Sequence, residues 1–170
     1  MGLMSNQRIN PPEKLNSSHQ LDQFDCGNLQ LNNCLKHRAF KNEIQGASRT
    51  YVVTVENVVV AYYCLANGAI AQTISTGKVK RNMPDPIPVM IIGRLAVDLN
   101  WQGQRIGKAL LRDAILRTLQ ASEIAGIRAI LVEAISEEAK QFYEKCGFTV
   151  SPIASMTLMI TINDAISSLT

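Results

Sequence analysis

One short segment of the chain has the residue pattern of a phosphate-binding site. Val89 to Val97 is almost continuously apolar and predicts a central strand buried on both faces, and Gly107 opens a run with apolar residues at helical spacing. The glycine-containing loop Gln102–Gly107 lies between them. Because the first N–H groups of a helix have no partner within the helix, such a loop can present them to an anion.

Two common nucleotide motifs do not fit this loop. A P-loop needs four residues between its first glycine and the Gly-Lys-Ser/Thr group, but only three separate Gly103 from Gly107, and Ala109 offers no hydroxyl for magnesium. The dinucleotide pattern Gly-x-Gly-x-x-Gly is also absent. The loop therefore indicates another class of phosphate-binding protein.

The first half of the chain predicts a helix followed by a hairpin. The first ~20 residues, with Pro11-Pro12, predict a loose segment or an edge strand. Apolar residues recur at helical spacing from Asn28 to about Asn42, and Gly46 ends that region. The β-branched runs Tyr51–Val55 and Val58–Leu65, with a two-residue polar turn between them, predict the hairpin.

The second half alternates strands and helices. Residues 75–88 predict a basic, proline-broken loop, and a helix of about 14 residues is expected from Gly107. A strand at Ala129–Ala134 precedes a helix that is capped by Ser136 and ends near Gly147, and strands follow at 148–150 and 156–162. The pattern predicts a mixed α/β fold, one sheet with helices on both faces, in a single domain over residues 1–170.

Composition is that of an ordinary globular protein, with 46% hydrophobic and 18% charged residues. The four cysteines form no Cys-x-x-Cys pair and only two histidines exist, so free thiols and no metal site are expected. No apolar run reaches the ~20 residues that span a bilayer, and no leader pattern is present, so a cytoplasmic protein is predicted.

The net charge of +3 is modest, but basic residues gather in two segments, around residues 36–41 and 78–81. They are either one anion-binding region or two ordinary solvated faces. Arg94, within the predicted central strand, needs a partner, which is either a structural ion pair or a substrate phosphate.

Three segments together resemble the GNAT superfamily of acetyltransferases. Gly93–Asp98 resembles its central splayed strand, Gln102–Gly107 its pyrophosphate loop with the pattern Gln/Arg-x-x-Gly-x-Gly/Ala, and Phe142–Phe148 its last helix and turn. The resemblance implies a mostly antiparallel, splayed sheet and acetyl-CoA as the cofactor. The implied cofactor-binding residues are Leu95, Ala96, Val97, Gln102, Gly103, Gln104, Arg105, Ile106, Gly107, Lys108, Ala109 and Ser136.

Two of these positions depart from the family pattern. Arg105 stands where the pattern has its middle glycine, and we expect it to keep a negative φ and donate its backbone N–H, with its guanidinium as a further phosphate contact. Ser136 stands where many members have an asparagine. Tyr143 matches the tyrosine that protonates the departing CoA thiolate, a role that its ordinary pKa of ~10 permits; the alternative is a core tyrosine.

More narrowly, the chain resembles the acetyltransferase toxins of bacterial toxin-antitoxin pairs. The segments that carry this resemblance include Phe24–Asn28, Gly46–Val53, Arg81–Pro88 and Met156–Met159. It implies acetylation of the α-amine of aminoacyl-tRNA, which blocks translation, with a ribbon-helix-helix antitoxin as partner and a homodimer. No carboxylate or histidine stands out as a base, and an α-amine of pKa ~8 or lower needs little base.

The basic residues then become candidates for binding tRNA phosphates. These residues are Lys36, Arg38, Lys41, Lys78, Lys80, Arg81 and Arg94. Two alternatives remain: an acetyltransferase of a small amine or a protein amine, and a non-catalytic CoA-binding interaction module.

Overall fold

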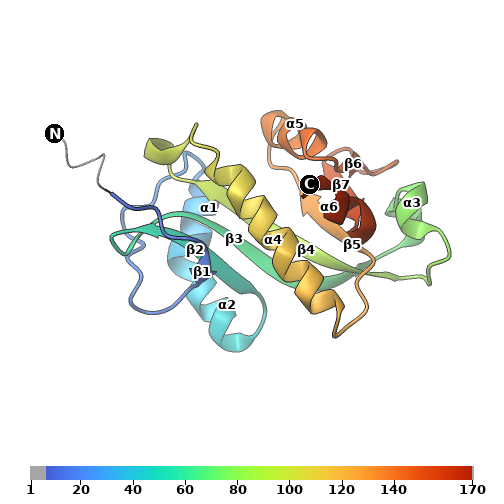
Figure 1. Cartoon of the computed structure of the whole chain (residues 1–170), viewed down its shortest axis with the longest axis horizontal. Coiled ribbons are helices and arrows are strands. Elements are labelled where there is room, and N and C mark those ends of the chain that lie inside the picture. Colours follow the sequence, from blue (N-terminus) through green and yellow to red (C-terminus); the bar gives the residue numbers. More distant parts are fainter. Residues whose placement is uncertain (1–6, 170) are drawn as a thin grey trace. The chain divides into compact units, whose positions relative to one another are not determined.

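A computed structural model describes residues 7–169, which form two compact units (Figure 1). The first unit comprises the chain up to Leu65 together with Arg94–Asp113, and the second comprises Ala66–Gly93 together with the chain from Ala114. Three elements contribute residues to both units: β3 (Val58–Ile70), β4 (Ile87–Val97) and α4 (Ile106–Ser122).

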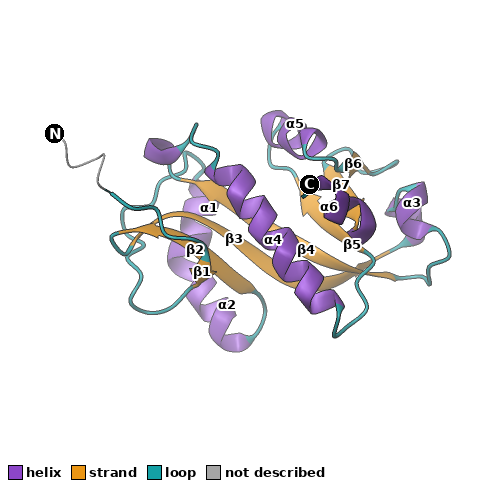
Figure 2. Ribbon diagram, in the orientation of Figure 1, coloured by secondary structure: helices purple, strands orange, loops and turns teal. Residues whose placement is uncertain are grey.

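The strands pair in the order β1-β2-β3-β4-β5-β7-β6 (Figure 2). The remaining strands are β1 (Glu13–Lys14), β2 (Arg49–Val55), β5 (Ala129–Glu133), β6 (Thr149–Val150) and β7 (Thr157–Thr161). β4 and β5 are parallel, whereas β1–β2, β2–β3, β5–β7 and β6–β7 are antiparallel. The mixed, mostly antiparallel sheet is therefore confirmed.

In the first unit, the predicted hairpin and its turn are confirmed. β2 and β3 pair from Arg49↔Leu65 to Val55↔Val58. Glu56 and Asn57 have φ values of 50° and 68°, the left-handed conformation that a tight two-residue turn requires. The two-residue strand β1 pairs with β2, which agrees with the edge strand expected near the N-terminus.

The early helix is broken into three parts: α1 (Leu29–Asn33), the π-helical turn η2 (Cys34–Arg38) and α2 (Ala39–Gln45). The Asn28 side chain caps its start by accepting a hydrogen bond from the N–H of Leu31, and Gly46, with φ of 74°, ends it. The sequence pattern predicted one regular helix, so the π-helical turn is a correction.

Helices cover both faces of β3 in this unit. Tyr62 and Tyr63 are adjacent and so point to opposite faces of the strand. The Tyr62 hydroxyl donates to the carbonyl of Leu31 on α1 at 2.7 Å, whereas the Tyr63 hydroxyl donates to Asp113 on α4. Phe24, Leu35 and Tyr62, all fully buried, belong to the core cluster on the α1 side.

In the second unit, β4 pairs with β5 from Val89↔Ala129 to Ile92↔Val132. β4 then continues to Val97, beyond the last pair of this ladder, as a splayed strand does. Val89 is buried but Ile91 is half-buried, as are Arg94 and Leu95 further along. The prediction that the strand is buried on both faces over its whole length is therefore wrong.

The other elements of this unit are η3 (Gln72–Ile74), α3 (Gly77–Lys80), α5 (Glu137–Lys145) and α6 (Ile162–Ser168). α3 lies within the segment predicted to be a loop, and α6 replaces the end of the predicted last strand. The caps of α5 are confirmed, since Ser136 Oγ accepts from the N–H of Ala139 and Gly147 has φ of 98°. Among the described residues, no helix is long and apolar enough to cross a membrane.

Candidate functional site

The predicted phosphate loop turns into α4 through two residues with positive φ. Gly103 has φ of 83° and Arg105 has φ of 65°, and α4 begins at the next residue, Ile106. The prediction of a negative φ for Arg105 is wrong: this arginine adopts the conformation for which the family pattern uses glycine. An L-residue in the left-handed region costs roughly 1–2 kcal/mol.

The loop is exposed up to the residue at which α4 begins. Gln102, Gly103, Gln104 and Arg105 are exposed, whereas Ile106 is buried. The carbonyl of Arg105 accepts from the N–H of Ala109 at 3.2 Å, so the helical hydrogen bonds begin at this residue. The N–H groups of the first helical turn therefore lie next to an exposed loop, which is the arrangement that binds a phosphate.

The Gln102 side chain ties the loop to two other segments. Its Nε2 donates to the carbonyl of Val97 at the end of β4 at 2.9 Å, and to the carbonyl of Cys26 at 3.3 Å. Gln102 is thus a bracing residue whose amide holds the loop against the splayed end of β4.

Asp98 connects the residues before the loop to the segment around Asp25. It is 7% exposed, and its two carboxylate oxygens accept from the N–H of Asp25 at 3.0 Å and of Asn100 at 2.9 Å. The N–H of Leu99 in turn donates to the carbonyl of Asp25 at 2.8 Å. The segment around Asp25 and the approach to the loop are therefore held together by two hydrogen bonds, and the third orders the approach itself.

The network continues into α1 through Asn32. Asp25 Oδ1 accepts from the N–H of Gly27 and from Asn32 Nδ2, both at 2.9 Å, and Asn32 Oδ1 accepts from the N–H of Cys26 at 2.9 Å. The hydrogen bonds from Gly27 and then Asn32 lower the pKa of Asp25. The Phe24–Asn28 segment, noted in the sequence without a role, thus connects the phosphate loop to the first helix.

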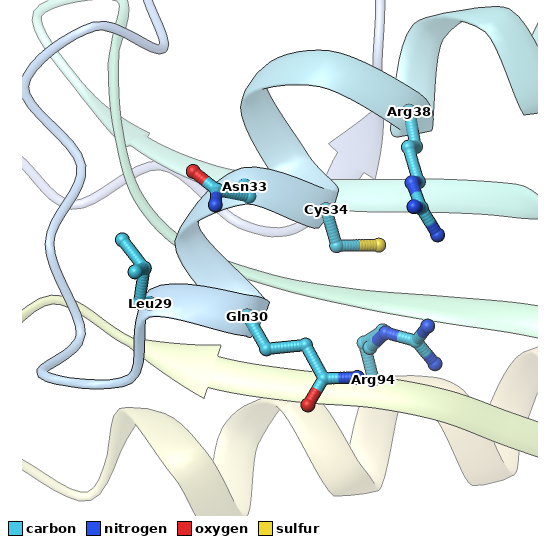
Figure 3. A pocket seen from close by; sticks show the side chains of 6 residues that line it. All are labelled: Leu29, Gln30, Asn33, Cys34, Arg38 and Arg94. Carbon is cyan, nitrogen blue, oxygen red and sulfur yellow. The ribbon is translucent and has the colours of Figure 1, made fainter.

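α1, η2 and β4 enclose a pocket of about 490 Å³ (Figure 3). Its lining residues are Leu29, Gln30, Asn33, Cys34, Arg38 and Arg94. Two of the predicted RNA-binding residues, Arg38 and Arg94, therefore meet in one cavity, although they lie far apart in the sequence. Sequence reasoning missed Gln30, Asn33 and Cys34, because their local pattern does not show that Arg94 on β4 lies opposite this part of the helix.

The other predicted basic residues of the first unit lie outside this lining. Lys36 lines a second pocket of about 550 Å³, together with Asp22 and Asp25 among others. Lys41 is exposed on α2. The first basic segment is thus divided between a cavity and the surface.

In the second unit, Lys78, Lys80 and Arg81 are exposed, with both lysines on α3. Lys78 Nζ lies 3.0 Å from Asp164 Oδ2, and this hydrogen bond lowers the pKa of Asp164. Arg128 donates to the carbonyls of Lys78 and Val79 at 2.8 and 3.1 Å, which fixes the end of α3. The basic segment is therefore held in place rather than being an open loop.

Tyr143, on α5, is 6% exposed and packed between aromatic rings. Its ring centroid lies 5.2 Å from that of Phe142 and 5.5 Å from that of Phe148. Burial, with a smaller contribution from Cys146, raises the pKa of Tyr143 to about 12. The hydroxyl is therefore protonated at neutral pH, as a proton donor must be.

Within the described part of the chain, the cysteines form no disulfide and the residues that could bind a metal form no cluster. All four cysteines are free, and no cluster of three histidines, cysteines or acidic residues within residues 7–169 is placed to hold a metal. The chemistry that this arrangement supports is phosphate binding by a loop, anion binding by a pocket and proton donation by a buried tyrosine.

A strand continued beyond its parallel ladder, a predicted phosphate loop at the start of α4 and a buried tyrosine on α5 are the features expected of an acetyltransferase of the GNAT class. The model of the acetyltransferase (GNAT) domain matches residues 46–150, and the chain belongs to this family. A tRNA-acetylating toxin of Mycobacterium tuberculosis (strain ATCC 25618 / H37Rv) is 42% identical over 154 residues, which cover 91% of this chain and 93% of that protein.

Solved structures of toxins have the same fold. AtaT complexed with acetyl-methionyl-tRNAfMet has a TM-score of 0.86 and 28% identity, covering 96% of this chain and 100% of that one. A tyrosine-to-phenylalanine variant of AtaT, bound to the C-terminus of the antitoxin AtaR and to acetyl-CoA, has a TM-score of 0.79 and 27% identity, covering 93% of this chain and 96% of that one.

Proposed function

We propose that this chain transfers the acetyl group of acetyl-CoA to the α-amine of the amino acid on aminoacyl-tRNA and so acts as a toxin that blocks translation. The observation that carries this proposal is the 42% identity, over 91% of the chain, to a tRNA-acetylating toxin. The arrangement of the residues agrees with it, since the first unit holds both an exposed phosphate loop and a pocket with two guanidinium groups. Because the family match spans residues of both units, we treat residues 1–170 as one acetyltransferase domain.

In this proposal, acetyl-CoA supplies an acetyl group activated as a thioester. The N–H groups of the loop and of the first turn of α4, from Gly103 to Ala109, hold the pyrophosphate. The backbone of Leu95–Val97, beyond the β4–β5 ladder, holds the thioester oxygen. Ser136 already caps α5, so a contact with the cofactor arm would share its hydroxyl with the N–H of Ala139.

Tyr143 provides the proton for the leaving group. The neutral α-amine attacks the thioester carbonyl, the carbon–sulfur bond breaks, and the thiolate takes the hydroxyl proton of Tyr143. The amine nitrogen then loses its extra proton, which restores the tyrosine directly or through water. Tyr143 is protonated at neutral pH, and because burial raises its pKa to about 12 it is a weaker acid than an exposed tyrosine, so it gives up its proton only as negative charge develops on the sulfur.

The basic residues bind the phosphates of the RNA. On α1–α2 and β4 these are Lys36, Arg38, Lys41 and Arg94, and at α3 they are Lys78, Lys80 and Arg81. The ion pair of Lys78 does not prevent this role, because both of its side chains are substantially exposed, at 68% and 43%, and such pairs contribute little. We therefore expect tRNA binding to weaken steeply with salt.

The proposal includes the partners and the location of a toxin. A ribbon-helix-helix antitoxin, a homodimer in the free state and a cytoplasmic site of action all follow from the toxin assignment. An AtaT variant has been captured with the C-terminus of AtaR, which supports an antitoxin as the protein partner.

A comparison of acceptor amines tests the substrate. We expect kcat/KM with a mixed pool of aminoacyl-tRNAs to exceed that with spermidine or with peptide N-termini by several orders of magnitude. Equal or better use of a polyamine or a peptide would assign the chain to small or protein amines. Acetyl-CoA binding without turnover on any amine would make it a non-catalytic CoA-binding module.

A further inference from the structure

The pocket between α1, η2 and β4 has the composition of an anion site. It is lined by two guanidinium groups, two carboxamides, a thiol and one leucine, and none of its described lining residues is acidic. Two positive charges that face the same cavity repel each other, and a bound anion removes that repulsion. Guanidinium groups bind phosphates and carboxylates through paired N–H donors.

The side chains of Cys34, Arg38 and Arg94 lie on one side of the helix with the Gln30 amide, whereas Leu29 and Asn33 point away from the arginines (Figure 3). Arg38 extends from the end of η2 and Arg94 from β4, with the thiol of Cys34 between them, and the Gln30 amide lies beside Arg94. Cys34 and Arg38 stand at the two ends of the π-helical turn, which is closed by the hydrogen bond from the N–H of Ala39 to the carbonyl of Cys34, and both line the pocket. Single π-helical turns occur frequently at functional sites, because they redirect side chains at a cost in helix stability.

The volume of the pocket indicates which kind of anion would fill it. A volume of about 490 Å³ lies within the range of roughly 300–1,000 Å³ that is usual for small-molecule sites. The acidic side chain of one amino acid would fill only part of it. A nucleotide matches this lining better, since its phosphate suits the guanidinium groups and its base edge suits the Gln30 carboxamide beside them.

We propose that this pocket holds the 3′-terminal nucleotide of the charged RNA, with Arg38 and Arg94 on its phosphodiester. The inference rests on the proposed function and deepens it: it names the part of the substrate that this cavity recognises. Lys36 and Lys41, which do not line the cavity, then bind phosphates further from the aminoacyl end. Arg94, half-buried on β4, is a specificity-determining residue because it distinguishes an aminoacyl nucleotide from the same aminoacyl nucleoside.

Two non-hydrolysable acceptors with the same α-amine test the assignment: an aminoacyl-CCA trinucleotide and an aminoacyl-adenosine without phosphate, both amide-linked. We expect Arg94→Gln to lower the ratio of kcat/KM between trinucleotide and nucleoside by about 10–100-fold, the loss of a charge-assisted hydrogen-bond pair. Arg94→Lys keeps the positive charge but not the paired N–H donors of the guanidinium group, so it should lower the ratio less. Lys14→Gln removes an exposed charge from β1 of the same unit and should leave the ratio at the wild-type value.

Two outcomes would overturn the proposal. An equal fall in kcat/KM for both acceptors in a folded Arg94→Gln variant would make Arg94 a residue that acts on the amine or on the fold. A weaker affinity for acetyl-CoA, measured calorimetrically without acceptor, would assign the pocket to the cofactor instead.

Failure of the proposed function can be distinguished from these outcomes. If the wild-type chain acetylated neither acceptor nor aminoacyl-tRNA, the proposed function would be wrong, and binding of the uncharged CCA trinucleotide would still test the pocket. Weaker binding of that trinucleotide by Arg94→Gln than by Lys14→Gln supports the pocket assignment, and equal binding contradicts it.

Discussion

The first unit contains two proposed anion-binding regions that differ in the groups that would bind the anion. At the Gln102–Gly107 loop, the donors are main-chain N–H groups at the start of α4, and the side chains of the loop are exposed. In the pocket, the donors are the guanidinium groups of Arg38 and Arg94, which stand on separate elements. The loop therefore depends on backbone conformation, whereas the pocket depends on residue type.

This difference explains why the loop accepts an unusual residue. Arg105 occupies a left-handed position where glycine is expected, but its N–H is unchanged by the side chain. No comparable freedom exists in the pocket, since replacing a guanidinium removes the donor itself. The two regions are nevertheless linked, because the Asp98–Asp25–Asn32 hydrogen bonds connect the approach to the loop with α1.

The largest effect is expected for substitution of Tyr143, which belongs to neither region. This variant therefore serves as a reference for variants of both regions. Tyr143→Phe removes the proton donor and leaves the loop and the pocket intact, so kcat should fall by roughly 10²–10⁴-fold. Affinities for acetyl-CoA and for tRNA should remain within about twofold, as measured by calorimetry and filter binding. Phe142→Leu, which alters the same aromatic cluster without a hydroxyl, is the matched control, and an equal loss there would reduce Tyr143 to a packing role.

Breaking the link between the regions should have the next largest effect. Asp98→Ala leaves the N–H groups of Asp25 and Asn100 without their acceptor, which we expect to lower the free energy of unfolding by about 2–4 kcal/mol. Because the link serves both regions, KM should rise for acetyl-CoA and for aminoacyl-tRNA together. Asp22→Ala, an exposed carboxylate in the same unit, should change neither quantity in urea unfolding or kinetics.

The pH profile separates the chemistry from both binding regions, because neither guanidinium groups nor main-chain amides titrate below about pH 12. kcat/KM should rise about tenfold per pH unit while the acceptor α-amine, of pKa ~8 or lower, is protonated, and then remain flat. Since burial raises the pKa of Tyr143 to about 12, loss of its proton cannot lower the rate before that range. Amide-linked acceptors allow the measurement, and a decline near neutral pH that Tyr143→Phe abolishes would contradict the assignment.

The smallest effect tests the dependence of the loop on conformation. Arg105→Gly should raise the free energy of unfolding by about 1 kcal/mol, because glycine adopts φ of 65° without the strain of an L-residue. Gly103→Ala should lower it by a similar amount, as φ of 83° is unfavourable for alanine although nothing crowds the added methyl group. Thermal unfolding measures both, and a stabilising Gly103→Ala would show that the loop adopts another conformation.

Local signals in the sequence predicted much of this fold. Ser136 caps its helix as expected, because capping depends on one side chain and its next few N–H groups. The π-helical turn at Cys34–Arg38 and the left-handed Arg105 were not predicted, since both depend on how the chain packs and closes rather than on local propensity. The pocket escaped prediction for the same reason, as Arg38 and Arg94 meet only in three dimensions.

The most direct test of the central claim is the identity of the acetylated atom. Aminoacyl-tRNA is incubated with the chain and acetyl-CoA, digested with ribonuclease, and its terminal aminoacyl-adenosine is identified by mass spectrometry. We predict N-acetyl-aminoacyl-adenosine with the acetyl group on the α-nitrogen, formed by the wild-type chain and strongly reduced for Tyr143→Phe. Unmodified aminoacyl-adenosine, with acetyl-CoA bound and intact, would contradict the account.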